Sequence, residues 1–122
     1  MPTSGLVERS DTMAEARAHR RLAAILAADV VGYSRLIGLD EAGTLLALRE
    51  VWAMRFNPFV AEFRGRIVKM LGDGALVEFS SAVDAVECAV AIQGAMAEHN
   101  SLRPEREPIE FRIGVNLGEV VI

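Results

Sequence analysis

Hydrophobic positions along the chain change from strand-like to helix-like spacing within its first half. Residues 22–31 form the almost wholly apolar run LAAILAADVV, which is typical of a strand buried on both faces. Residues 40–63 follow with helical spacing, and Pro58 predicts a kink in that helix. The apolar positions of this helix, which we expect in the core, are Leu45, Leu48, Trp52, Phe56 and Phe59.

The next part of the chain predicts a hairpin and a second helix. Residues 67–79 read as a strand, a tight turn Gly-Asp-Gly, and another strand. Ser81, with Asp84 three residues later, fits a capping box that opens a helix ending near His99. The buried stripe of this helix is predicted to include Val83, Val86, Val90 and Met96.

A polar loop with two prolines precedes the last element. Apolar residues alternate from Ile109 to Val115 and predict a strand. Gly118 and Glu119 then lead into a further apolar stretch that reads as a new strand. The predicted order is strand, helix, hairpin, helix, strand, which corresponds to an α/β sandwich with helices against one mixed sheet.

The length and composition limit the classes of protein that the chain can belong to. With 122 residues, 52% of them hydrophobic, we expect one domain at residues 21–122 behind a polar tail or leader helix at residues 1–20. A net charge of -4 disfavours a nucleic-acid partner, because neutralising phosphates needs a basic surface. A single cysteine, no membrane-length apolar run and no signal peptide predict a cytoplasmic protein without a membrane segment.

Two aspartates stand out as candidate chemistry. Asp29 ends a buried strand, where an ionised carboxylate needs a cation or another partner. Asp73 lies at the predicted hairpin tip, so both carboxylates can converge if the hairpin lies beside the first strand. Magnesium prefers one or two carboxylates together with substrate phosphates, so this pair is compatible with phosphoryl-transfer chemistry. The turn at residues 30–34 adds free backbone N–H groups that can cradle a triphosphate, and Gly32 allows a close approach.

Each of these residues also has a purely structural interpretation. A strand-end aspartate such as Asp29 often caps the following turn, and Asp73 with Gly74 is an ordinary hairpin-turn pair. Lys69 in a hairpin strand usually faces solvent. His99 is most simply a favourable positive charge near a helix C-terminus.

Three motifs in order resemble the class III adenylate and guanylate cyclases. The segment 28–34, ADVVGYS, is similar to the first metal motif of that family. The segment 66–74, RIVKMLGDG, with Phe79 six residues after Asp73, is similar to the second, and the segment 111–118, FRIGVNLG, resembles the next strand. The resemblance extends from about Arg21 to Ile122. It implies a ferredoxin-like α/β sandwich of the nucleotidyl cyclase type, truncated after the fourth strand.

The resemblance also implies a function and its residues. It implies conversion of ATP to the cyclic nucleotide and pyrophosphate with two Mg²⁺ or Mn²⁺ ions, with Asp29 and Asp73 as catalytic residues. The metal ligands would be Asp29, Val30 and Asp73, and Lys69 would read adenine, which favours ATP over GTP. The backbone of four residues would hold the phosphates: Val30, Val31, Gly32 and Tyr33.

The family's catalytic asparagine, transition-state arginine and dimerisation arm follow the last matched strand. Sites of this family form between two chains, so the resemblance implies a homodimer for the complete domain and little cyclase activity for this chain alone. Two alternatives remain at this point. One is a cyclase-like binding or regulatory module, and the other is the palm of polymerases and diguanylate cyclases, which shares the paired aspartates.

Overall fold

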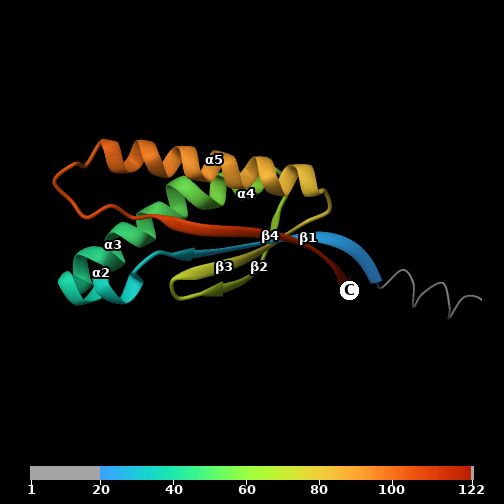
Figure 1. Ribbon diagram of the computed structural model, residues 1–122, viewed down its shortest axis with the longest axis horizontal. Helices are drawn as coiled ribbons and strands as arrows, with labels where there is room; N and C mark the ends of the chain where they lie inside the picture. Colours follow the sequence, from blue (N-terminus) through green and yellow to red (C-terminus); the bar gives the residue numbers. More distant parts are fainter. Residues whose placement is uncertain (1–19, 122) are drawn as a thin grey trace, which may run out of the picture.

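The computed structural model describes residues 20–121, and it forms one layer of helices on one sheet (Figure 1). The predicted tail at residues 1–20 lies outside the described residues except for Arg20. In chain order the elements are β1 (Arg20–Val30), α2 (Tyr33–Leu39), α3 (Glu41–Val51), the π-helix η1 (Trp52–Phe56), α4 (Asn57–Glu62), β2 (Arg66–Leu71), β3 (Gly74–Phe79), α5 (Ala82–Ser101) and β4 (Phe111–Val121).

The four strands have the order β2-β3-β1-β4, and every neighbouring pair is antiparallel. This is the β-α-β-β-α-β arrangement of a ferredoxin-like sandwich, so the predicted fold class is confirmed. The prediction of a mixed sheet is wrong. Each helical connection joins two parallel strands, but a third strand lies between them and runs in the opposite direction, so parallel strands never pair.

Over residues 24–30, strand β1 is fully buried on one face only. Leu26, Ala28 and Val30 are buried beneath the helices, whereas Ala27 is exposed and Ile25 is half-buried on the opposite face. The expectation that both faces are buried is therefore wrong. A run of small alanines does not distinguish a covered face from an uncovered one, because alanine is common in both.

The first helical region contains a change of helix type. Leu48 and Phe56 are in the core as predicted, but Leu45 is exposed. The N–H of Asn57 donates to the carbonyl of Trp52, five residues back, which gives the π-helical spacing of η1. Pro58, which has no N–H to donate, falls in the first turn of α4.

Helix α5 begins as predicted but presents a different face to the core. The Ser81 hydroxyl oxygen accepts a hydrogen bond from the N–H of Asp84 at 3.2 Å, which confirms the cap. Val83, Val86 and Val90 are exposed, so the predicted stripe is wrong apart from Met96. The residues that α5 buries are Ala85, Cys88, Ile92, Met96 and His99.

Strand β4 continues through Gly118 as one element of 11 residues. It pairs with β1 without interruption from Phe111, opposite Val30, to Val121, opposite Arg20. The predicted break at Gly118 and Glu119 is wrong, because the neighbouring strand supplies a partner at every position. Among the helices of residues 20–121, none has both the length and the apolar composition needed to cross a bilayer.

Candidate metal and nucleotide site

The hairpin tip is fixed to the end of β1. Asp29 is paired in register with Gly74 on one side and with Arg112 on the other. The N–H of Val30 donates to the carbonyl of Asp73 at 2.9 Å. These contacts hold Asp29 and Asp73 at one edge of the sheet, although the two residues are 44 positions apart in the chain.

Gly74 permits this close approach. A Cβ atom at position 74 would lie 2.6 Å from the carbonyl oxygen of Ala28 and 3.4 Å from the Cβ of Asp29. The turn itself consists of Gly72 and Asp73, and Gly74 is the first residue of β3. The assignment of Asp73 and Gly74 as the turn pair is therefore wrong, and Gly74 is instead needed for strand contact.

Both aspartates line one shallow pocket of about 370 Å³ on the helix-free face of the sheet. Arg112 and Leu71 also contribute to its walls. Asp29 is partly exposed and Asp73 is half-buried, so an ion or a phosphate can reach both carboxylates from solvent.

Arg112 contacts Asp29 through two hydrogen bonds. Its Nε donates to Oδ1 at 3.1 Å, and its Nη2 donates to Oδ2 at 3.0 Å. This hydrogen bonding, together with the carboxylate charge, raises the pKa of Arg112. Arg112 could not be identified from the sequence, because it lies 83 positions from Asp29 and only the register of β4 against β1 places the two residues side by side.

The donor set fits a magnesium-like ion. Within residues 20–121 no group of three or more His, Cys, Asp and Glu side chains could hold a metal, so an all-protein cage is absent from this part. Two carboxylates with substrate phosphates are the arrangement that Mg²⁺ accepts. A valine side chain has no donor atom and that of Val30 lies in the core, so Val30 can serve as a ligand only through its backbone carbonyl.

The strand-to-helix turn offers fewer free N–H groups than expected. The N–H of Val30 is bonded to Asp73, and the N–H of Val31 donates to the carbonyl of Glu110 at 2.8 Å, so the expectation that both are free is wrong. The first helical bond runs from the N–H of Leu36 to the carbonyl of Gly32. The N–H groups between these positions have no partner within α2. Gly32 has a φ of 65°, a left-handed conformation that glycine adopts without strain.

Lys69 is exposed on β2, an edge strand of the sheet. It is paired with Leu76, which is in turn paired with Ala27. Side chains that are paired directly across a sheet point to the same face, and so do side chains two positions apart on a strand. Lys69 therefore lies on the same open face as Asp29, two strands away and two residue pairs further from the hairpin tip.

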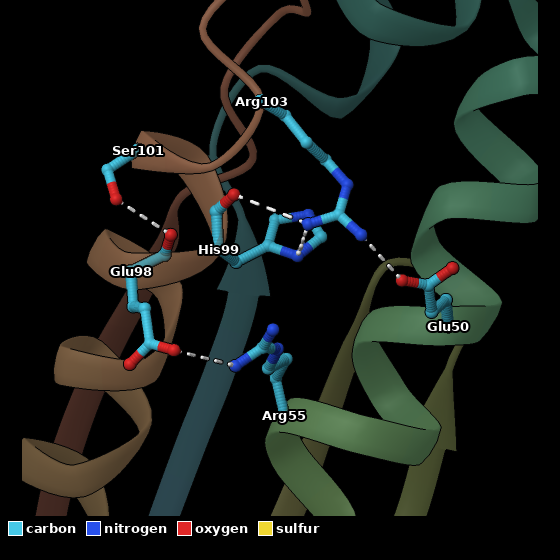
Figure 2. A network of polar contacts seen from close by, with 6 residues as sticks. All are labelled: Glu50, Arg55, Glu98, His99, Ser101 and Arg103. Atoms are coloured by element: carbon cyan, nitrogen blue, oxygen red, sulfur yellow. Dashed lines mark hydrogen bonds and ion pairs between the residues drawn. The ribbon is translucent and has the colours of Figure 1, made fainter.

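His99 is separate from this pocket and is the buried member of a polar network at the end of α5 (Figure 2). Arg103 lies between His99 and Glu50, with its Nη1 3.2 Å from His99 Nδ1 and its Nη2 donating to Glu50 at 3.1 Å. Burial lowers the pKa of His99, and the charges of Arg103 and Arg55 lower it further against an opposing effect of Glu50. The prediction of a positive charge is wrong, because these effects favour the neutral imidazole.

Comparisons with known proteins agree with the fold and the motifs. The chain is 53% identical over 110 residues to a protein of Rhizobium meliloti (strain 1021) provisionally named adenylate cyclase 3, covering 90% of this chain and 19% of that protein. It is 37% identical over 101 residues to an adenylate cyclase of Streptomyces coelicolor, covering 83% of this chain and 25% of the relative. No protein-family model matches.

Among solved structures, the chain superposes on the adenylate/guanylate cyclase/hydrolase from Silicibacter pomeroyi with a TM-score of 0.76 and 43% identity. The match covers 84% of this chain and 60% of that one. The sequence and the fold are therefore those of a class III adenylate/guanylate cyclase catalytic domain. The chain spans about a fifth to a quarter of the length of the two curated relatives.

Proposed function

We propose that this chain forms the metal-binding and phosphate-binding part of a nucleotidyl cyclase that converts ATP to the 3',5'-cyclic nucleotide and pyrophosphate. The observation that carries the proposal is the pocket shared by Asp29 and Asp73 at the fixed hairpin tip. The names of the relatives support the same activity. The palm of polymerases and diguanylate cyclases is not favoured by any of these neighbours.

In this proposal Asp29, Asp73 and the backbone carbonyl of Val30 hold two Mg²⁺ or Mn²⁺ ions. Such ions make a hydroxyl a better nucleophile and offset the charge on a leaving pyrophosphate. The protein's own task is to hold the two carboxylates at one distance and orientation. The Val30 to Asp73 backbone bond and the close contact of Gly74 with β1 serve that task.

The triphosphate binds in this proposal at the start of α2. The N–H groups of Gly32, Tyr33 and Ser34 are the donors that the turn leaves available, whereas Val30 and Val31 use theirs within the fold. Backbone donors of this kind attract anions because the N–H dipoles point outward together. The left-handed Gly32 lets the chain turn within one residue from the strand to these donors.

Lys69 completes the proposed substrate contacts by reading the adenine ring, which favours ATP over GTP. The support for this role is that Lys69 is exposed and lies on the same sheet face as Asp29. In a complete cyclase domain, which is expected to act as a homodimer, groups after the last matched strand would supply the rest of the site. The helix-free sheet face is the surface from which such groups would approach.

The test uses a chimera in which this chain replaces the matching 110-residue segment of the Rhizobium meliloti relative. With ATP and Mg²⁺ or Mn²⁺, we expect cyclic AMP formation that falls about a hundredfold or more in Asp73→Ala, because charge stabilisation at the transition state is lost. The chain alone should form little or no cyclic AMP.

Two results would contradict this account. Cyclic AMP formation by the chain alone, above its own Asp73→Ala variant, would show that the downstream groups are not required. An unchanged rate for the Asp73→Ala chimera would remove the carboxylate from the mechanism. A chimera that is folded but inactive with either metal would instead favour a binding or regulatory module.

A further inference from the structure

The Asp29 carboxylate is already occupied by a cation that the chain itself supplies. Arg112 donates one hydrogen bond to each carboxylate oxygen, at 3.1 and 3.0 Å. This is the bidentate geometry in which two parallel N–H groups of a guanidinium donate to the two oxygens of a carboxylate. Arg112 also lines the pocket shared by Asp29 and Asp73.

Arg112 is not needed to hold β4 against β1. The two strands are paired at every position from Arg20 opposite Val121 to Val30 opposite Phe111, so the backbone ladder already fixes them. The Arg112 side chain is 73% exposed and the Asp29 side chain is 44% exposed. An ion pair in water holds weakly, because solvent and salt screen it, so another cation can displace it.

We propose that Arg112 is an internal counter-ion of Asp29 that competes with the catalytic metal for this carboxylate and moves away when the metal binds. This inference rests on the proposed function of the aspartate pair. A divalent ion and a guanidinium on the same two oxygens would repel each other, so each lowers the affinity of the other. The pair keeps Asp29 neutralised and oriented until metal arrives with its nucleotide.

The competition predicts a gain of metal affinity when the guanidinium is removed. In Mn²⁺ titrations of the full chain followed by electron paramagnetic resonance, we expect Arg112→Gln to bind about two- to fivefold more tightly than the wild type. Arg112→Lys keeps the positive charge but cannot make the bidentate contact. Its Mn²⁺ affinity should therefore lie between those of the wild type and Arg112→Gln. Adding salt should narrow the difference between Arg112→Gln and the wild type, because screening weakens the wild-type pair.

The matched control is Arg64→Gln. Arg64 also donates to both oxygens of an aspartate, Asp84, at 3.2 Å, and its side chain is 77% exposed. This substitution makes the same change in net charge away from the pocket, so Mn²⁺ affinity should stay at the wild-type value. An equal gain of Mn²⁺ affinity in Arg64→Gln would mean that the gain in Arg112→Gln comes from the change in net charge, and this would overturn the proposal.

A third variant, Asp73→Asn, separates this inference from the proposed function. If Asp73→Asn weakens Mn²⁺ binding while Arg112→Gln leaves it equal or weaker, the metal site stands and the competition is overturned. If Asp73→Asn binds Mn²⁺ as the wild type does, the ion is not in this pocket and both proposals fail. Thermal unfolding of each variant shows whether a change in affinity reflects loss of the fold.

Discussion

Gly74 sets how closely the hairpin approaches Asp29. Its missing side chain leaves room for the Ala28 carbonyl, which would lie 2.6 Å from a Cβ atom at this position. Real Cβ atoms do not come that close to an oxygen, so any larger residue must push β3 away from β1. The two aspartates of the pocket depend on that contact, because Asp73 directly precedes Gly74 in the chain.

We therefore expect Gly74→Ala to weaken Mn²⁺ binding about tenfold or more, because the contacts that orient metal ligands strongly affect the affinity for the metal. The matched control is Gly72→Ala in the adjacent turn, where an added Cβ would meet nothing within 4 Å. Isothermal titration with Mn²⁺ measures both variants. Equal affinities for the two variants would mean that the strand contact does not govern the site.

The candidate site was only partly predictable from individual residues. Asp29 and Asp73 could be selected because a carboxylate at a strand end or a hairpin tip is unusual chemistry beside apolar runs. Arg112 could not be selected from the sequence, because its contact with Asp29 depends on the register of β4 against β1. The bonded N–H groups of Val30 and Val31 also follow from tertiary contacts that no local pattern shows.

Helix α5 shows why a correct element can have the wrong face assigned. Its sequence is apolar around most of its circumference, so two stripes with helical spacing compete. The face that packs against the sheet carries Ile92 at 0% exposure, whereas Val90 is 67% exposed. The boundaries were predictable from the Ser81 cap, but the choice of face depends on which residues fit the sheet beneath it.

We expect Ile92→Ala in α5 to lower the free energy of unfolding by about 2–5 kcal/mol, because it leaves a cavity beneath the helix. Val90→Ala, on the opposite face of the same helix, should change it by less than about 0.5 kcal/mol. Urea denaturation followed by circular dichroism measures both. Similar losses for the two variants would contradict the assigned face.

For the whole molecule, the sheet order brings together residues that lie far apart in the sequence. The order β2-β3-β1-β4 places the hairpin tip and Arg112 on opposite sides of Asp29. Helices α4 and α5 lie over one face of the sheet and α2 lies beyond its end, which leaves the other face and its pocket accessible (Figure 1). The alternation of strands and helices predicted the layers, whereas the antiparallel pairing followed only from the strand order.

Asp29 and Asp73 are proposed to bind divalent metal ions at one shared site. The most direct measurement is the line broadening that substoichiometric Mn²⁺ causes in the amide resonances of the ¹⁵N-labelled chain. We expect amides at residues 29–33 and 72–75 to broaden first and together, and we expect Asp73→Asn to remove both effects. Broadening centred on acidic surface residues such as Glu105 and Glu107, with residues 29 and 73 unaffected, would contradict it.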